Sequence, residues 1–243
     1  MVLAAGRGER MRPLTDTCPK PLLEVGGRPL LQWHLSALAR AGVTDAVVNT
    51  AWLGEQIPAR FGDRWTEAGV AGEVRLRYSM EGRDFGAALE TAGGIARALP
   101  LLDAVFWVVA GDVFVPDFDF DPAALQRFAR GDALAHLWLV PNPAHNARGD
   151  FGLAPEGLAL NLAPDAPGPR YTYSTIGLYR RELFAAPLLD IAAGNPAGQA
   201  AALGPLLRRA MDLGRISAEI HTGRWTDVGT PERLAFLNQT VTP

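Results

Sequence analysis

Near its start the chain carries Leu3-Ala4-Ala5-Gly6-Arg7-Gly8-Glu9-Arg10-Met11-Arg12-Pro13-Leu14-Thr15, and Pro19-Lys20-Pro21 follows closely. A short apolar segment, residues 1–5, leads into two glycines. Because glycine has no Cβ, backbone N–H groups can approach an anionic oxygen there and hydrogen-bond it. Arg10, Arg12 and Lys20 crowd positive charge into the same loop, and a polyanionic ligand is the simplest explanation for that crowding. We therefore predict a phosphate-binding loop after a first β-strand.

Two other phosphate-binding motifs fit this stretch less well. A P-loop needs Gly-x-x-x-x-Gly-Lys followed by Ser or Thr, and no Gly-Lys-Ser or Gly-Lys-Thr tripeptide occurs in the chain. The dinucleotide-binding fingerprint needs a third glycine where Met11 stands, and the next strand ends in Asn49-Thr50 without the acid that binds a ribose. Neither motif is predicted.

Strand and helix patterns alternate along the chain. Apolar runs predict strands, and apolar residues at helical spacing predict helices. The predicted strands are residues 46–48, 74–78, 105–110, 133–140, 172–179 and 216–222, and the predicted helices are 29–42, 55–61, 199–211 and 231–239. This alternation, with the buried run 105–110 in its middle, is typical of an α/β fold with parallel strands covered by helices.

Composition limits the class of protein. The 243 residues carry a formal net charge of −3, which excludes the broad basic surface that attracts nucleic acid or anionic lipid. The only cysteine, Cys18, has no partner for an internal disulfide, which suits a reducing compartment. No charged leader precedes the first strand, and no run approaches the ~20 apolar residues that span a bilayer. We expect a cytoplasmic protein that binds neither nucleic acid nor membrane.

Residues 3–21 resemble the signature of the sugar-phosphate nucleotidyltransferases, L-A-x-G-x-G-x-R-[LM]-x-P-L-T followed by P-K-P. The apolar strand that ends in Gly111-Asp112 and the segment Trp225-Thr226-Asp227-Val228-Gly229-Thr230 agree with the same family. The resemblance implies a Rossmann-like fold with a mixed, mostly parallel sheet flanked by helices. It also implies one domain over residues 1–243, in which 1–130 mainly bind the nucleotide and 131–243 mainly bind the sugar and supply the second metal ligand.

The resemblance implies transfer of a nucleotidyl group from a nucleoside triphosphate to a sugar 1-phosphate, with pyrophosphate as the second product. By resemblance, Arg10 and Lys20 bind phosphate, and Asp112 and Asp227 hold Mg²⁺. Two reacting anions meet in this reaction, so electrostatic repulsion is the barrier that a hard cation and positive side chains lower. From position alone, Asp112 after Gly111 fits a carboxylate that projects into a cleft, or equally a cap or turn.

Further contacts are implied residue by residue. The expected nucleotide-binding residues are Leu3, Ala4, Ala5, Gly6, Gly8, Glu9, Arg10, Lys20, Glu81, Glu90, Thr91 and Gly111, and the expected sugar-binding residues are Asn142, Asp150, Gly152 and Thr175. Glu9 could orient Arg10 or touch the ribose. The resemblance makes UTP the favoured nucleotide, and Glu81 or Glu90 could accept the N3–H of uracil. Two departures from the family concern the sugar: Leu162-Ala163-Pro164 replaces the Glu-Lys-Pro that often contacts sugar hydroxyls, and Thr175 stands where N-acetylglucosamine relatives commonly carry Asn. N-acetylmuramate 1-phosphate is the favoured sugar, because its bulky 3-O-lactyl group would explain the loss of polar contacts.

Several alternatives remain open at this point. The chain could be another sugar-1-phosphate uridylyl-, thymidylyl- or guanylyltransferase, or a non-catalytic nucleotide-binding regulator. The alternation Asp117-Phe118-Asp119-Phe120-Asp121 contains the D-x-D metal motif of glycosyltransferases that use nucleotide sugars, although an exposed turn with its phenylalanines inward explains it more simply. The four histidines lack the spacing of zinc ligands, so zinc is not expected.

Overall fold

The computed structural model describes residues 1–163 and 165–241. Contacts between residues divide the chain into two compact units. Unit 1 comprises Met1–Glu90, Val109–Pro122 and Arg224–Pro243, and unit 2 comprises Thr91–Val108 and Ala123–Gly223. The chain therefore enters unit 1 three times, and the unit combines its first and last segments.

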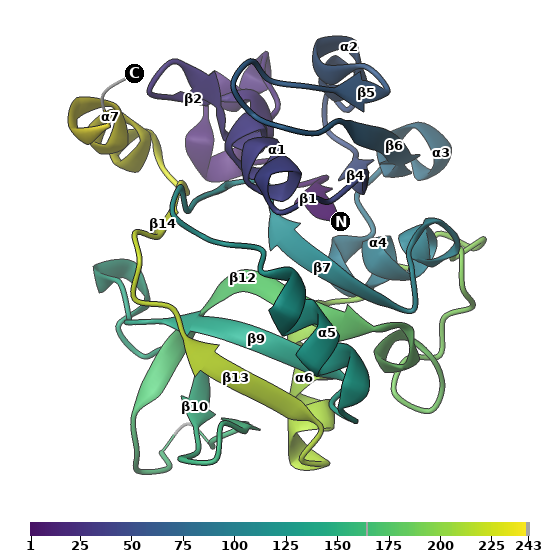
Figure 1. Ribbon diagram of the computed structural model, residues 1–243, viewed down its shortest axis with the longest axis vertical. Coiled ribbons are helices and arrows are strands. Elements are labelled where there is room, and N and C mark those ends of the chain that lie inside the picture. Colours follow the sequence, from purple (N-terminus) through teal and green to yellow (C-terminus); the bar gives the residue numbers. More distant parts are fainter. Residues whose placement is uncertain (164, 242–243) are drawn as a thin grey trace. The chain divides into compact units, whose positions relative to one another are not determined.

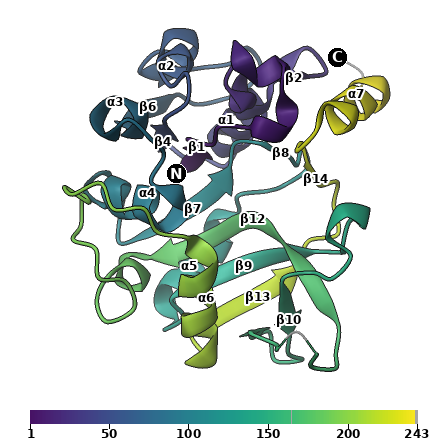
Figure 2. The ribbon, with the colours of Figure 1, turned by 180° about the vertical axis from the view of Figure 1, so that it is seen from behind.

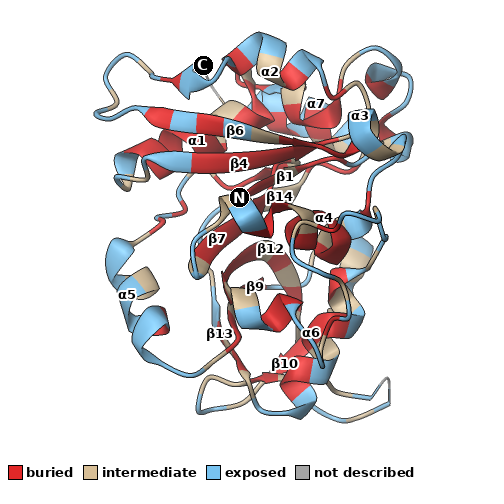
Figure 3. Cartoon of the chain, turned by 90° about the vertical axis from the view of Figure 1, so that its right-hand side faces the viewer, coloured by how far each residue is buried: buried red, intermediate tan, exposed pale blue. Residues whose placement is uncertain are grey.

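Unit 1 is built on a parallel sheet. Its strands are β1 (Val2–Ala4), β4 (Asp45–Thr50), β6 (Val74–Met80) and the last residues of β7 (Val105–Ala110), with the antiparallel β5 (Arg64–Trp65) beside β6. Strand β1 lies in the interior of this sheet, because Val2 pairs with Val48 on one side and with Val109 on the other. Figure 3 shows that β1 and β4 are buried almost throughout. Their continuous apolar runs fit strands that helices cover on both faces.

Helices and a small hairpin complete the first half of unit 1 (Figure 1). The elements are the hairpin strands β2 (Glu24–Val25) and β3 (Arg28–Pro29), and the helices α1 (Leu30–Arg40), α2 (Gln56–Phe61) and α3 (Glu81–Phe85). The hairpin turns through Gly26 and Gly27, whose φ angles are +59° and +72°. Two consecutive positive φ angles characterise a tight type I′ turn, and glycine adopts them without strain.

The C-terminal segment joins unit 1 through β14 (Thr226–Asp227), which pairs antiparallel with β8 (Val113–Phe114). Helix α7 (Pro231–Thr240) follows, and its N-cap residue Thr230 accepts a hydrogen bond from the backbone of Arg233. A core cluster draws on both ends of the chain: Met11, Leu23, Val25, Leu30, Phe114, Val228, Leu234 and Leu237. This shared core holds the N-terminal loop and the β14 segment in one body.

Unit 2 contains a mixed sheet (Figure 2). Its strands are the start of β7, β9 (Ala135–Val140), β10 (Phe151–Leu153), β11 (Ala159–Leu160), β12 (Arg170–Arg180) and β13 (Ile216–Ile220). Strand β12 runs antiparallel to β9, and β13 runs parallel to β9. A register shift between Tyr173 and Ile176 marks a bulge in β12.

The helices of unit 2 are α4 (Glu90–Ala98), α5 (Pro122–Arg130) and α6 (Leu203–Asp212), of which α4 and α5 begin in the last residues of unit 1. Arg180 satisfies the carboxyl end of α5, because its guanidinium donates to the carbonyls of Phe128, Ala129 and Gly131. Short 3₁₀ helices occur at Glu9–Met11, Leu14–Asp16, Lys20–Leu22, Leu99–Leu101, Ala144–Asn146 and Arg181–Phe184.

Most of the expected elements are present, and the mixed, mostly parallel sheet flanked by helices is confirmed. One helix starts later than predicted. Residues 199–202 are not helical, because Asn195 binds the backbone of Gln199 through both ends of its amide. The alternation at 117–121 has buried phenylalanines and an exposed Asp119, as expected. Within the described residues, no helix is long and apolar enough to cross a membrane.

Candidate functional site

The predicted phosphate loop follows β1 and turns sharply at Gly8, whose φ is +66°. A side chain at Gly8 would approach Thr15 to 3.1 Å and Lys20 to 3.3 Å. Glycine at this position therefore allows the loop to fold back on itself. Gly6, Glu9 and Arg10 are exposed on this loop, whereas Ala4 and Ala5 are buried against the sheet.

Arg7 and Trp52 fix the same loop from the side. The Arg7 guanidinium lies 3.6 Å from the centre of the Trp52 ring and donates to the carbonyl of Thr15 at 3.0 Å. The indole N–H of Trp52 donates to that carbonyl at 2.8 Å, and the Thr15 hydroxyl donates to the carbonyl of Gly8. Arg12 pairs with Asp16 at 3.0 Å. This arginine is one of the three cations that suggested a polyanionic ligand, and it has a partner within the chain.

Lys20 forms an ion pair with Asp112 in unit 1. Its ammonium lies 2.6 Å from Asp112 Oδ2, and the Lys20 side chain is 9% exposed. Lys20 is also the only lysine in a chain that otherwise uses arginine for its cations. Gly111 precedes Asp112, donates to the Leu3 carbonyl at 2.8 Å, and would place a Cβ 3.0 Å from that oxygen. The glycine thus lets the Asp112 turn lie close against β1.

The second predicted metal ligand, Asp227, lies beside Asp112 along the backbone. Asp227 pairs with Val113 across β8 and β14, and the Val228 N–H donates to the Asp112 carbonyl at 3.1 Å. Two carboxylates that are 115 positions apart in sequence are therefore carried on paired segments. Arg233 holds Asp227, because its guanidinium donates to Asp227 Oδ2 at 2.7 Å and to the Asp227 carbonyl at 2.9 Å.

These two aspartates are the residues that could hold a divalent cation. Each carboxylate has a basic partner, Lys20 or Arg233, and each is partly exposed, by 39% for Asp112 and 24% for Asp227. Carboxylate oxygens are the ligands that Mg²⁺ takes, together with water and substrate phosphates. The described residues contain no group of three or more His, Cys, Asp or Glu side chains placed to hold a metal ion by themselves. Water and substrate phosphate oxygens are the further ligands that Mg²⁺ takes beside two carboxylates.

His34 supports this region from α1. Its Nε2 lies 3.0 Å from the Val113 carbonyl, and burial lowers the pKa of His34 to about 4, although that carbonyl and the charge of Asp112 act in the opposite direction. The ring is therefore neutral near pH 7, and Nε2–H donates to Val113. Cys18, beside Pro19, has its pKa raised by burial and by the nearby Glu24, which keeps the thiol protonated.

The three residues expected near the base differ in position. Glu81 is fully buried, and its two oxygens accept from Asn49 Nδ2 at 2.7 Å and from the Leu89 N–H at 2.8 Å. That burial contradicts a direct contact with uracil. Glu90 is exposed at the start of α4 and has a positive φ of +55°. Thr91, the next residue, is half-buried and opens the first segment of unit 2.

The four residues expected near the sugar all lie in unit 2. Asn142 donates to the Arg170 carbonyl at 2.9 Å and accepts from the Thr172 hydroxyl at 3.0 Å. Asp150 accepts from the Tyr173 N–H at 2.8 Å, so both residues fasten their loop to β12. Gly152 lies under Leu162, which a Cβ there would contact at 2.6 Å.

Thr175 lies in the bulge of β12 with a positive φ of +67°. A positive φ is unusual for a β-branched residue and is often found where function requires a strained backbone.

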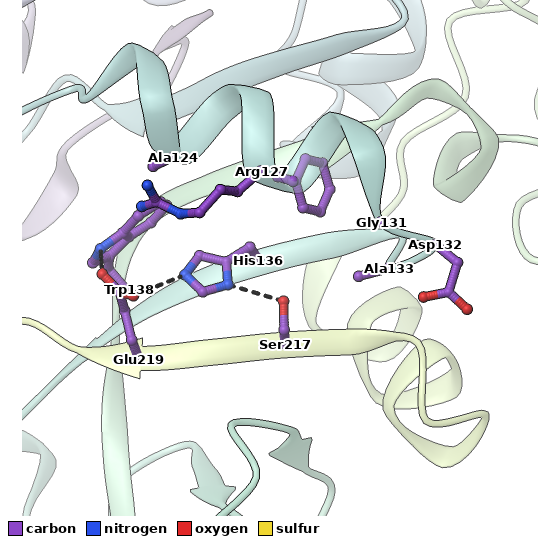
Figure 4. Close-up of a pocket in the computed structure, with 10 residues that line it drawn as sticks. Ala124, Arg127, Gly131, Asp132, Ala133, His136, Trp138, Ser217 and Glu219 are labelled. Carbon is purple, nitrogen blue, oxygen red and sulfur yellow. Dashed lines mark hydrogen bonds and ion pairs between the residues drawn. The ribbon is translucent and has the colours of Figure 1, made fainter.

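Unit 2 also has a pocket of about 260 Å³ under α5, drawn in Figure 4. His136 lies at its centre, with Nδ1 2.9 Å from the Ser217 hydroxyl and Nε2 3.6 Å from a Glu219 oxygen. The indole of Trp138 donates to the other Glu219 oxygen at 2.6 Å. Because these polar groups bind one another, the pocket adds nothing to the candidate site.

Comparison with known proteins assigns the family. A family model described as nucleotidyl transferase matches residues 1–242, and the chain belongs to this family of transferases. Over 237 residues it is 49% identical to the N-acetylmuramate alpha-1-phosphate uridylyltransferase of Neisseria meningitidis, covering 96% of this chain and 94% of that one. It is 32% identical to the protein of the same name from Caulobacter vibrioides, over 96% and 92% of the two chains.

A solved structure supports the fold. The crystal structure of a putative glucose-1-phosphate thymidylyltransferase from Bacillus anthracis, in complex with a sucrose, aligns with a TM-score of 0.77 over 98% of this chain and 93% of that one, at 20% identity. At that identity the likeness concerns the fold alone.

The sequence missed three residues of the candidate site: Trp52, Asn49 and Arg233. Arg233 lies six positions after Asp227 in the sequence, near the start of a predicted helix, and this position could have suggested a cation beside Asp227. Trp52 and Asn49 follow from no local pattern, because their partners are 37 and 45 positions away.

Proposed function

We propose that the protein transfers the uridylyl group of UTP to N-acetylmuramate 1-phosphate, with Mg²⁺, and releases pyrophosphate. The backbone pairing that carries Asp112 and Asp227 side by side, next to Lys20, is the main structural support. The names of the two relatives support the choice of sugar and nucleotide.

In this reaction an oxygen of the sugar phosphate attacks the α-phosphorus of UTP. A new P–O bond forms as the bond to the β-phosphate oxygen breaks, and the electron pair leaves with pyrophosphate. Asp112 and Asp227 would hold Mg²⁺, which would supply positive charge against the negative charge that builds on the phosphoryl oxygens. Backbone N–H groups at Gly6 and Gly8 would bind the triphosphate, and Gly8 allows the tight turn they need.

Lys20 and Arg10 have separate parts in this proposal. Lys20 is buried and fixed by Asp112, so its charge is available without a large loss of conformational entropy when phosphate binds. Arg10 is exposed on the loop and would bind the β- and γ-phosphates, which become the leaving group. Both residues stabilise charge, and no protein nucleophile is needed.

The test is incubation with UTP and a panel of sugar 1-phosphates: N-acetylmuramate, N-acetylglucosamine and glucose 1-phosphates. Release of pyrophosphate that is fastest with the N-acetylmuramate compound supports the proposal. In a parallel incubation with a UDP-sugar, release of UDP by a protein that ignores UTP would instead indicate a glycosyltransferase. Binding of UTP without turnover for any sugar would indicate a regulator.

The single lysine offers a second readout of nucleotide binding. An amine-reactive reagent can modify only one ε-amine in this chain, that of Lys20. Bound UTP should slow modification of Lys20, as measured by peptide mass spectrometry. Equal rates with and without saturating UTP would remove Lys20 from the proposed nucleotide site.

A further inference from the structure

A buried carboxylate connects two parts of unit 1 that are both proposed to bind the nucleotide. Glu81 stands at the junction of β6 and α3 and is 0% exposed. Burying an ionised carboxylate is costly unless hydrogen bonds stabilise the charge. Glu81 has such bonds on both oxygens, from Asn49 Nδ2 at 2.7 Å and from the Leu89 N–H at 2.8 Å.

Asn49 extends this connection to the phosphate loop. While its Nδ2 donates to Glu81, its Oδ1 accepts from the Ala4 N–H at 2.9 Å, in a buried contact. Ala4 is the last residue of β1, immediately before the loop that contains Gly6 and Gly8. The order of hydrogen bonds is therefore Ala4, Asn49, Glu81 and Leu89, and every member belongs to unit 1.

The other end of this chain of hydrogen bonds reaches a strained residue. Leu89 precedes Glu90, whose φ of +55° is unusual for a residue with a side chain. Such a conformation persists only where neighbouring contacts hold it. The bond from the Leu89 N–H to Glu81 fixes the peptide just before Glu90, while the exposed Glu90 side chain stays accessible to a ligand.

The position of Glu81 is itself fixed by close packing. Gly82 follows it, and a Cβ on Gly82 would collide with the Ala51 carbonyl. Ala51 directly follows β4, the strand that ends in Asn49-Thr50. The backbone next to Glu81 therefore packs directly on the segment that carries its partner Asn49, which leaves the carboxylate little freedom to move.

We propose that Glu81, through Asn49 and the Leu89 N–H, is a positioning residue that fixes the phosphate loop and the Glu90 segment in one mutual geometry and thereby sets nucleobase selectivity. It does so without touching the nucleotide. The inference rests on the proposed function, because it assumes that both segments bind the same nucleoside triphosphate.

The first test is Glu81→Gln. The Leu89 N–H and Asn49 Nδ2 are both donors, so the amide Nε2 of a glutamine would face one of them, and that bond is lost. We expect the KM for UTP to rise about tenfold and the preference for UTP over dTTP, CTP and GTP to fall about tenfold. The kcat at saturating UTP should change less than threefold, because the proposed catalytic side chains are untouched.

A rescue variant separates positioning from general destabilisation. In the double variant Asn49→Asp with Glu81→Gln, the new carboxylate at position 49 can accept from the Ala4 N–H and from the glutamine Nε2, while the glutamine Oε1 accepts from the Leu89 N–H. All three hydrogen bonds and the single negative charge are then retained, with the charge moved to position 49. We expect UTP preference to return to within about twofold of the wild type. Asn49→Asp alone would place two buried carboxylates together and is not needed for the test.

The matched control is Tyr179→Phe in unit 2. It removes a buried hydroxyl that lies 2.6 Å from the Tyr173 hydroxyl, so it lowers stability without changing the Glu81 connection. Its base preference should equal that of the wild type. If Glu81→Gln lowers the melting temperature but leaves the KM and base preference unchanged, or if the double variant fails to restore them while folding normally, the proposal is wrong.

Calorimetric binding of UTP and GTP, without sugar phosphate, distinguishes this failure from failure of the proposed function. Absence of nucleotide binding by the wild type would remove the proposed function. Binding by the wild type, with the same UTP preference in Glu81→Gln, would overturn the positioning role alone.

Discussion

The proposed phosphate-side residues of unit 1 and sugar-side residues of unit 2 are held in different ways. Asp112 and Asp227 are paired with the cationic side chains Lys20 and Arg233. Asn142 and Asp150 are instead bound to the backbone of β12, at Arg170 and Tyr173. A carboxylate paired with a cationic side chain can exchange that partner for a metal ion, whereas a side chain that fastens a loop cannot leave without cost. Changes in unit 1 should therefore affect turnover, and changes in unit 2 should first affect stability.

The largest effect is expected from Asp112→Asn and from Asp227→Asn. Each substitution removes a proposed ligand of the Mg²⁺ that offsets the phosphate charge, so kcat should fall by about 10³-fold or more. The melting temperature should change little, because both side chains are partly exposed. The measurement is steady-state pyrophosphate release together with thermal unfolding.

Asp119→Asn is the control for these two variants. Asp119 is exposed in the alternation at 117–121 and should have little effect on turnover. An equal loss of turnover at Asp119 would move the metal to the D-x-D motif and overturn the assignment of Asp112.

The second prediction concerns stability and pH. The pKa of His34 is about 4 in the folded protein and 6.5 in its ordinary state, so folding favours the neutral ring. The stabilisation is fully present above pH 6.5 and is lost as the pH falls towards 4, by about 3 kcal/mol at most. Urea unfolding at pH 7, 5 and 4 should show a difference between the wild type and His34→Gln that shrinks on acidification.

His136 in unit 2 is the comparison residue for this experiment. Burial lowers the pKa of His136 as well, and the carboxylate of Glu219 offsets part of this lowering. His136→Gln should therefore reduce the pH dependence of the free energy of unfolding by less than His34→Gln does. A larger effect at His136 would show that acid sensitivity comes from unit 2.

The sequence predicts a phosphate loop from a signal that is local. Glycines, cations and prolines within about 20 residues are visible without knowing the fold. The pairing of β8 with β14 could not be predicted in this way, because each strand has only two residues and the contact spans more than 100 positions. Short strands are stabilised by tertiary packing, here by a core that includes Phe114 and Val228.

The role of a side chain was harder to predict from the sequence than the fact that the residue is unusual. Glu81 was singled out as an acceptor for uracil, but it is fully buried and accepts from Asn49 Nδ2 and from the Leu89 N–H. Asn142 and Asp150 were singled out as sugar contacts, and the structure shows them fastening a loop. A sequence pattern marks a polar residue as unusual, but whether a ligand or the protein itself uses that residue depends on burial, which only the fold determines.

The third prediction tests the contrast in unit 2. In Asp150→Asn, the new amide cannot accept from Tyr173 N–H and from Asn146 as the carboxylate does, so a polar group is left unsatisfied. We expect a loss of about 1–3 kcal/mol in the free energy of unfolding. The KM for sugar 1-phosphate should rise more than the KM for UTP. Asp103→Asn, at an exposed aspartate of the same unit, should be neutral in both measurements.

The smallest effect is expected at the strained bulge of β12. Thr175 has a φ of +67°, and asparagine adopts positive φ at lower cost than a β-branched residue. Thr175→Asn should therefore stabilise unit 2 by about 1 kcal/mol at most. Because Asn is common at this place in N-acetylglucosamine relatives, the KM for N-acetylglucosamine 1-phosphate should fall relative to that for the N-acetylmuramate compound.

Thr222→Asn controls for the general effect of asparagine, because Thr222 is exposed and its φ is not positive. It should be slightly destabilising or neutral. Thr175→Asn could instead lower the melting temperature more than Thr222→Asn does. The contacts of the Thr175 side chain would then stabilise the protein by more free energy than the positive φ costs. The hydrogen bond from its hydroxyl to the Ser174 carbonyl, at 2.5 Å, would then be the contact that stabilises the bulge. The strain at Thr175, like that at Glu90, would in that case be offset within the protein, and unit 2 would need no ligand to explain it.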